Sequence, residues 1–425
     1  MRVLHVISAP GPGGAGHQVR LLVRRLPHDS EVVTLTPVGA PASSADRPDV
    51  VADALRADGT RVHRLTTRGD LDPGAVGRLR ALIRAGRYDL VHTHLFQACV
   101  QGRLAARLAG VRNVVATEHH LAIEHHLAIK HHLGAGHHPG AGHRFDTGHH
   151  LGAGPVGGRR VSPGVRAVYL AGERLGRVTI APSPAIARRL RSWGVPEERI
   201  AVIPAAVDTA EFRFDERVRA RARARLGIAP GVPLVGGVGR LEPEKRFDLL
   251  IRAVAETPDA CLLLVGDGSA RAALERLAVI EGVADRVLFA GAVPHARELL
   301  CAMDVFASPD RRSAGLATLE AIACGLPALY ATCPPLEQRA AGRAPVRGTH
   351  RFAARDRESL PRALRAELLC LTERRGARLP ARSVGIRYDA DHFAAAVGRL
   401  YERIAEPPGR RRVIAPLLAY RARSG

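Results

Sequence analysis

The sequence predicts an α/β protein with two doubly wound, Rossmann-like domains that face a cleft. Short apolar runs alternate with amphipathic helical stretches in the first half of the chain, and the same alternation restarts in the second half. Such a βαβα order is typical of parallel sheets covered by helices on both faces. A length of 425 residues is sufficient for two cores of this kind.

The first half opens with a buried parallel strand at 3–7, which runs into a glycine-rich loop. A helix is expected after Ser183, because serine caps helix N-termini and the first turn accepts Pro184. The other elements expected here are helices at 17–26 and 101–109 and strands at 90–94, 114–117, 177–181 and 200–203. Residues 208–230 are polar and arginine-rich, and we expect them to connect the two domains.

The second half repeats the pattern and gives three segments in all. We expect an N-terminal domain at 1–207, a second domain at 208–390, and a segment at 391–425 whose helix packs back toward the N-terminal domain before a basic tail. Strands are expected at 234–238, 261–265, 286–290 and 304–307, and helices at 246–256, 270–280, 295–302, 315–324 and 391–404. Gly325 and Pro327 mark the end of the helix at 315–324.

A histidine-rich hexapeptide array interrupts the first domain at 119–154 and holds eleven of the 20 histidines. A period of six does not return to one face of an α-helix, and the glycine-rich half of the array lacks the apolar density of a core. Histidine tracts can bind metal, but an ordered site requires a fixed ligand geometry. We therefore expect a flexible surface insertion that binds metal adventitiously in vitro, with no dedicated metal site and no cofactor.

The composition limits the possible partners and location. The net charge of +22 suggests anionic partners such as nucleotide phosphates, an acidic membrane surface or nucleic acid. The alternative is a genome-wide bias towards arginine codons, which the even spread of the arginines favours. Nucleic acid is not expected, because the arginines are spread along the chain and no aromatic stacking platform accompanies them. The six cysteines form no CxxC pair and no apolar run approaches the roughly 20 residues of a membrane span. We expect a cytoplasmic protein that can contact an anionic membrane peripherally.

One basic pair stands out as a candidate phosphate site. Only two of the 63 basic residues are lysines, Lys130 in the array and Lys245. Lys245 follows Arg240 on a loop that leaves a buried strand, where an ammonium and a guanidinium together can clamp a diphosphate. The alternative is a lysine that survives by chance on a solvated loop.

Further polar and glycine positions are candidates for a nucleotide-sugar site. Glu320 lies in an apolar helix, where it either faces solvent or binds hydroxyls such as a ribose diol. His119 can bond to a sugar hydroxyl or can simply be the first histidine of the array. Gly13 and Gly14 belong to a loop that allows close backbone approach to a phosphate, but its spacing is not the GxGxxG fingerprint, which disfavours a nicotinamide enzyme.

Several ordered motifs resemble a known family. The runs GVGRLEPEKRFDLLIRA, LLLVGDGSARAALE and DVFASPDRRSAGLATLEAIACGLPAL, with the N-terminal MRVLHVISAPGPGGAG, resemble the retaining nucleotide-sugar glycosyltransferases of family GT4, which have a GT-B fold. The resemblance covers most of the chain outside 119–160 and the tail, and is closest in kind to actinobacterial members. It implies transfer of a hexose from a nucleotide diphosphate sugar, with retention, to an unknown acceptor: a lipid, a saccharide or a small molecule.

The resemblance also implies roles for individual residues. Arg240 and Lys245 match the pair that binds the diphosphate, and Glu320 matches the second glutamate of the E-x7-E motif, which holds the ribose. Gly13 and Gly14 match the N-terminal loop near the donor phosphates, and His119 matches the histidine that approaches the transferred sugar.

Three departures from the family pattern put the activity in question. Arg312 stands where the first glutamate of E-x7-E belongs, residues 313–315 read Ser-Ala-Gly in place of Gly-Phe-Gly, and the usual IPNGVD reads IPAAVD at 203–208. Loss of one transition-state contact commonly lowers the rate by a factor on the order of 10²–10³. The alternative function is therefore a catalytically impaired relative that binds nucleotide without sugar transfer.

Overall fold

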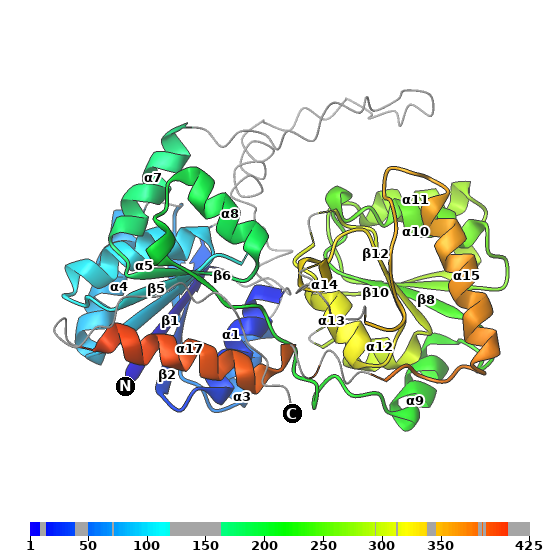
Figure 1. Cartoon of the computed structure of the whole chain (residues 1–425), viewed down its shortest axis with the longest axis horizontal. Coiled ribbons are helices and arrows are strands. Elements are labelled where there is room, and N and C mark those ends of the chain that lie inside the picture. The colour runs from blue at the N-terminus through cyan, green and yellow to red at the C-terminus, as the bar shows by residue number, and fades with distance from the viewer. Residues whose placement is uncertain are drawn as a thin grey trace.

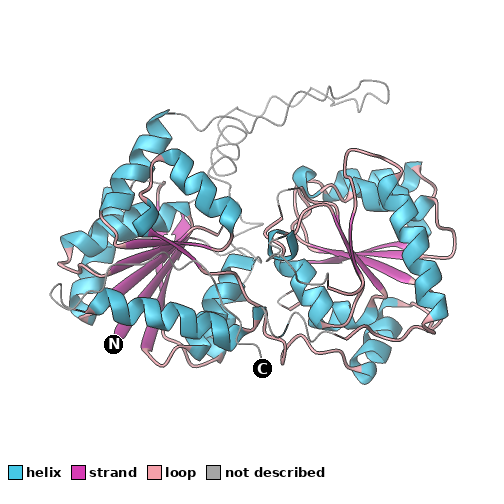
Figure 2. Cartoon of the chain, viewed as in Figure 1, coloured by secondary structure: helices cyan, strands magenta, loops and turns pink. Residues whose placement is uncertain are grey.

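Two α/β domains stand side by side in the computed structural model, each built on one parallel sheet with helices on both faces (Figures 1 and 2). The structure describes residues 1–8, 14–38, 50–69, 72–119, 163–293, 295–311, 313–337, 346–380, 385 and 388–406. The predicted fold class is confirmed. The hexapeptide array beyond His119 lies outside the described residues, and so do Gly13 and Arg312.

The N-terminal sheet has seven strands in the order β3-β2-β1-β4-β5-β6-β7. They are β1 (Arg2–Ser8), β2 (Asp29–Pro37), β3 (Val62–Thr67), β4 (Leu90–His94), β5 (Val114–Thr117), β6 (Val178–Ala181) and β7 (Ile200–Val202). The helices are α1 (Gly14–Arg25), α3 (Val50–Ala57), α4 (Pro73–Gly86), α5 (Phe96–Leu108), α7 (Pro163–Arg174) and α8 (Pro184–Trp193). The Ser183 side chain accepts a hydrogen bond from the Ile186 amide, as expected for the cap of α8.

The C-terminal sheet has six strands in the order β10-β9-β8-β11-β12-β13. They are β8 (Leu234–Val238), β9 (Cys261–Val265), β10 (Val287–Gly291), β11 (Val305–Ser308), β12 (Ala328–Tyr330) and β13 (Thr349–Arg351). The helices are α9 (Glu216–Leu226), α10 (Asp248–Ala255), α11 (Arg271–Ile280), α12 (Arg297–Ala302), α13 (Leu316–Ala323), α14 (Pro334–Glu337) and α15 (Ser359–Glu373).

The segment 208–230, which we expected to connect the two domains, contains the helix α9. Asp215 caps the helix, and Arg219 and Arg223 extend from it to Asp304, with nitrogen–oxygen distances of 2.7 and 3.1 Å. The side chains of Arg223 and Asp304 are both buried. These two arginines therefore hold the segment to the C-terminal domain.

The chain crosses between the domains twice, and the two crossings lie together. The Val207 amide donates to the Tyr388 carbonyl at 2.8 Å, just before α17 (Ala390–Ala405) returns to the N-terminal domain (Figure 1). Tyr401 on α17 is fully buried there, in the core cluster that also contains Val3 and Leu22. Both crossings thus tie the domains at one edge of the cleft.

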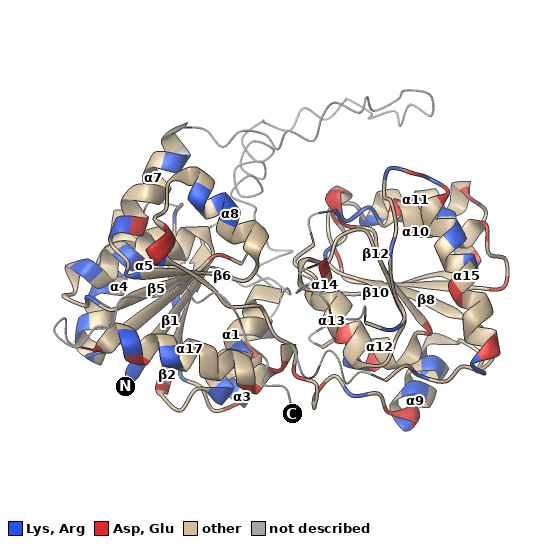
Figure 3. Ribbon diagram, in the orientation of Figure 1, with Lys and Arg blue, Asp and Glu red and all other residues tan. Residues whose placement is uncertain are grey.

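Charged residues are distributed over both domains. Basic and acidic side chains are interspersed on the described helices of each domain (Figure 3). Among the described residues, no helix has both the length and the apolar character needed to cross a bilayer.

Candidate functional site

A cavity of about 180 Å³ lies where α1 and α3 face the strand ends of the C-terminal sheet. Gly14, Arg240 and Glu320 all line it, so the structure brings together three of the residues that the sequence singled out. The carboxyl ends of parallel strands meet at one edge of a sheet, which is why β8 and β9 both deliver residues to it.

Two glycines shape the floor of the cavity at the ends of β8 and β9. Gly239 and Gly266 have φ angles of 157° and 140°, a region that L side chains rarely adopt. A Cβ atom on Gly266 would lie 1.9 Å from the Gly239 carbonyl oxygen. Only glycine therefore permits the two turns to touch, and this contact places Arg240 at the rim of the cavity.

Gly14 brings the two domains into contact at the start of α1. A Cβ atom there would lie 2.4 Å from Cδ1 of Leu316, the first residue of α13. The amino-terminal ends of α1 and α13 therefore meet at the cavity. Unpaired amide groups and the helix dipole make such ends favourable for anions.

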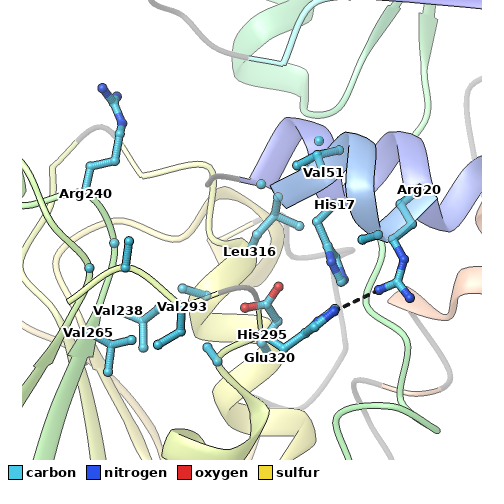
Figure 4. A pocket seen from close by; sticks show the side chains of 18 of the residues that line it. His17, Arg20, Val51, Val238, Arg240, Val265, Val293, His295, Leu316 and Glu320 are labelled. Carbon is cyan, nitrogen blue, oxygen red and sulfur yellow. Dashed lines mark hydrogen bonds between the residues drawn. The ribbon is translucent and has the colours of Figure 1, made fainter. Parts of the chain in front are cut away.

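Glu320 reaches the same cavity from α13 and lies beside His295 (Figure 4). Burial of the carboxyl group raises the pKa of Glu320 to about 7, and the nearby charge of Glu211 contributes in the same direction. The side chain therefore lines the cavity rather than the solvent face of the helix.

A polar network that the sequence analysis missed joins the two domains at the side of the cavity. Arg20 on α1 bonds to Asp58 at 2.6 Å and lies 3.2 Å from Nε2 of His295 (Figure 4). His295 Nδ1 lies in turn 3.2 Å from Glu211, and its hydrogen bond lowers the pKa of Glu211 to about 2. His17 also lines the cavity from α1, and burial lowers its pKa to about 4. The feature of the sequence that could have indicated this network was the polar face of α1, which directly follows the glycine loop.

Lys245 lies close to the Arg240 turn, but its ammonium group already has a partner. Lys245 Nζ donates to the buried carboxylate of Asp310 at 2.6 Å, and the residues that line the cavity do not include Lys245. The Cε atom of Lys245 would be 3.8 Å from a Cβ atom on Gly239, so its side chain passes close to the turn at Gly239. The position of Asp310 could not be foreseen, since it is 65 residues away in sequence.

His119 is separate from the cavity and follows β5 in the N-terminal domain. Its Nε2 lies 3.1 Å from Nδ1 of His94, which belongs to a buried group with His5 and His92. The ring nitrogens of His5, His92 and His94 lie within 4.8 Å of one another, a spacing at which three histidines can hold a metal ion. The alternation His-Thr-His on β4 placed two of these rings on one face, and the sequence analysis took it only as a strand.

Comparisons with known proteins agree over both domains. The sequence profile for Glycosyltransferase Family 4 matches residues 12–211, and that for Glycosyl transferases group 1 matches residues 232–368. The chain is 32% identical over 362 residues to a D-inositol 3-phosphate glycosyltransferase of Acidothermus cellulolyticus, and the match covers 76% of this chain and 72% of that protein.

Other relatives match over a shorter part. A GDP-mannose-dependent alpha-(1-6)-phosphatidylinositol monomannoside mannosyltransferase of Mycolicibacterium smegmatis is 42% identical over 147 residues, or 31% of this chain and 38% of the relative. A D-inositol 3-phosphate glycosyltransferase of Nocardia farcinica is 39% identical over 153 residues, or 33% of this chain and 34% of the relative. The chain thus spans little more than a third of these two proteins.

Solved structures establish the fold independently. HepE of Anabaena, solved with UDP and glucose, superposes with a TM-score of 0.71 at 19% identity and covers 94% of this chain and 99% of its own. Sucrose-phosphate synthase of Thermosynechococcus elongatus gives a TM-score of 0.70 at 20% identity, with 95% and 99% covered. The predicted resemblance is confirmed: the chain has the GT-B fold and belongs to glycosyltransferase family 4.

Proposed function

We propose that the protein transfers a hexose from a nucleoside diphosphate sugar to an acceptor hydroxyl with retention of configuration. The observation that carries this proposal is the cavity in which Gly14, Arg240 and Glu320 converge from both domains. A cation, two helix amino-terminal ends and a carboxylate at one site are complementary to a diphosphate linked to a ribose diol.

In this proposal each domain has its own substrate. The segment 208–390 binds the donor: Arg240 neutralises the diphosphate, Lys245 joins it after leaving Asp310, and Glu320 accepts hydrogen bonds from the ribose. The segment 1–207 supplies the Gly13–Gly14 loop beside the phosphates and holds the acceptor, and His119 approaches the transferred sugar. We also propose that the enzyme works in the cytoplasm, where its net charge of +22 favours peripheral contact with an anionic membrane.

The chemistry we propose takes place on one face of the sugar. The bond from the anomeric carbon to the diphosphate oxygen breaks as the acceptor oxygen bonds to the same face, and the acceptor proton passes to the departing diphosphate. Stabilisation of the charge that develops on the leaving group is the main contribution expected of the protein.

Donor selection is tested by thermal shift with UDP, GDP and ADP and their sugars, because a ligand that binds only the folded protein raises its melting temperature. Transfer is then followed by mass spectrometry with the stabilising donor and with inositol phosphates, lipids and saccharides as acceptors. Arg240→Ala should abolish the shift, whereas Arg362→Ala, at an exposed ion pair with Asp356, should leave it unchanged. An equal shift in both variants would remove Arg240 from the site.

A second candidate is the impaired relative that binds nucleotide without transfer, and the ion pair between Lys245 and Asp310 favours it. The substitution Arg312→Glu separates the two. A glutamate accepts hydrogen bonds from sugar hydroxyls, whereas arginine only donates. If the arginine at position 312 impairs sugar binding, the variant should therefore raise transfer or donor hydrolysis. Loss of an activity already present in the parent would show instead that Arg312 belongs to an altered donor site.

A further inference from the structure

A line of buried histidines runs from the middle of the N-terminal sheet to His119. His5 on β1 lies 3.2 Å from His94 on β4 through Nδ1 and Nε2, and His94 lies 3.1 Å from His119 through Nδ1 and Nε2. These residues are 0%, 2% and 7% exposed. His94 pairs in register with Ile7, two residues beyond His5, so each step moves toward the carboxyl edge of the sheet. That edge is where α/β proteins bind ligands.

The protonation state of the line follows from its burial. Burial lowers the pKa of His5 to about 3 and that of His94 well below its ordinary value, so both rings are neutral at neutral pH. A neutral imidazole carries one N–H donor and one lone pair. Each hydrogen bond in the line therefore has a direction, and all the directions are coupled.

His5, at the end of the line inside the sheet, determines the direction of these hydrogen bonds. Nε2 of His5 is buried and has no hydrogen-bond partner within the described part of the chain. A buried N–H group without an acceptor is rarer and more costly than an acceptor without a donor. His5 is therefore more stable with its hydrogen on Nδ1, from which it donates to His94. His94 then carries its own hydrogen on Nδ1 and donates to Nε2 of His119.

The neighbouring His92 takes no part in this line. Its Nδ1 lies 2.5 Å from the Tyr401 hydroxyl and its Nε2 lies 2.7 Å from Thr117 Oγ1, so both ring nitrogens have their own partners. A metal ion among His5, His92 and His94 would break the hydrogen bond between His5 and His94. It would also place two positive charges in the core of a sheet, which is costly without compensating anions.

We propose that His5 and His94 are positioning residues that fix the ring and the tautomer of His119, with its Nε2 as acceptor and its hydrogen on Nδ1. The consequence for catalysis rests on the proposed function, since only there does His119 approach the sugar. In that role His119 meets a sugar hydroxyl as a donor through Nδ1–H. The tautomer itself is a property of the folded chain and can be measured without any substrate.

The first test reads the tautomers of the full-length protein by ¹⁵N NMR of its imidazoles. His5, His94 and His119 are assigned from the signals that change in His5→Leu, His94→Asn and His119→Gln, and His5 and His94 are expected not to titrate near neutrality. We expect all three rings to carry hydrogen on Nδ1, the less common form in water. Hydrogen on Nε2 of His94 or His119 in the parent protein would overturn the proposal.

A matched pair of variants tests the direction of control. His5→Asn keeps a donor near the position of Nδ1 and should preserve the tautomer of His119, whereas His5→Leu removes the donor and should give a mixture. If about one tenth of the molecules keep the competent tautomer, kcat falls about tenfold in His5→Leu and recovers in His5→Asn. Unchanged imidazole signals of His94 and His119 in a folded His5→Leu variant would refute the proposal that His5 controls the tautomer of His119.

Two further outcomes are separable from these. If the parent transfers no sugar from any donor, the proposed function fails, and the NMR result alone decides whether His5 and His94 fix the tautomer of His119. The parent can also be compared with His5→Leu for Zn²⁺ binding. If the parent binds one Zn²⁺ more tightly and loses the NMR signal of the hydrogen bond between His5 and His94, the three histidines form a metal site and the proposed control of the His119 tautomer is wrong. The array histidines are present in both proteins, so their binding cancels in this comparison.

Discussion

At the scale of single residues, the ion pair between Lys245 and Asp310 decides how the basic pair can act. The Asp310 side chain is 5% exposed and the Lys245 side chain is 25% exposed, so the contact joins a buried anion to a more accessible cation. A diphosphate must compete with Asp310 for the same ammonium group. Lys245, which the sequence singled out, is therefore paired with Asp310, which the sequence did not single out.

The first prediction concerns this competition. Lys245→Ala should weaken nucleoside diphosphate binding by about 1.5–3 kcal/mol, the usual worth of a hydrogen bond to a charged group, and leave binding of the bare nucleoside almost unchanged. Asp310→Asn should have the opposite effect, because it releases the ammonium group. Calorimetry with both ligands measures the two differences. An equal loss for nucleoside and diphosphate would remove Lys245 from the phosphate site.

The second prediction follows from the carboxyl group of Glu320, whose pKa burial raises to about 7. Only the ionised form accepts hydrogen bonds at both oxygens, so a nucleotide sugar should bind more tightly at pH 8 than at pH 6. Glu320→Gln should flatten this dependence in calorimetry. Because the folded protein holds this proton more firmly than the unfolded chain, stability from this group is present below pH 4.5 and falls as the pH rises to about 7.

The matching control is the melting temperature without ligand. Glu320→Gln should melt above the parent at pH 8, where the buried charge destabilises the parent, and close to it at pH 5. A parent whose donor affinity does not change between pH 6 and pH 8 would show that Glu320 does not contact the ribose.

At the scale of elements, α9 shows how a polar helix can be part of a domain. Asp304 at the start of β11 accepts from Arg219, Arg223 and the Leu234 amide, with the last distance 2.8 Å. Removing one partner from a buried ion pair leaves an uncompensated charge, which typically costs about 3–5 kcal/mol. The helix depends on this carboxylate more than on its own weakly apolar face.

The third prediction tests that dependence. Asp304→Ala should lower the free energy of unfolding of the C-terminal domain by about 3–5 kcal/mol, as measured by chemical denaturation. Glu298→Ala removes the exposed partner of Arg225 on the same helix and should change stability by at most about 1 kcal/mol. Similar losses in the two variants would mean that α9 is held by apolar contacts rather than by Asp304.

At the scale of the whole molecule, the two domains share one cavity, one polar network and two adjacent crossings. Arg20 and Gly14 approach the C-terminal domain at the cavity, while α17 returns to the N-terminal core at the other edge. The domains therefore meet at the cavity and are tied beside it.

The fourth prediction concerns the hexapeptide array, whose period of six builds no face that either domain could bury. Deletion of residues 121–154 should leave the fold intact and shift the melting temperature by no more than about 2 °C, the effect of roughly 0.5 kcal/mol in domains of this size. His119 is kept, so the imidazole signals of the buried line should also persist. A collapse of soluble yield or melting temperature would show that the array packs as structure.

The sequence by itself determined the fold class, the family and most strands, because a parallel strand is a short apolar run whose burial is a local property. The elements β2, β3, α4 and α15 were not predicted from the sequence, and neither was α9, whose arginines pair with the distant Asp304. Lys245 and Glu320 could be chosen as site candidates because one is a lysine among arginines and the other a carboxylate in an apolar helix, and Arg240 was chosen by its spacing from Lys245.

Only the tertiary structure decided what these residues meet. The pairing of Lys245 with Asp310, the approach of Gly14 to Leu316 and the line from His5 to His119 join positions that are 65, 302 and 114 residues apart. Hydrogen bonds and charge pairs act over a few ångströms, so their partners are set by how strands and domains are arranged in space. Local sequence carries the period that builds each element, but it does not carry the register and crossings that bring side chains of different elements into contact.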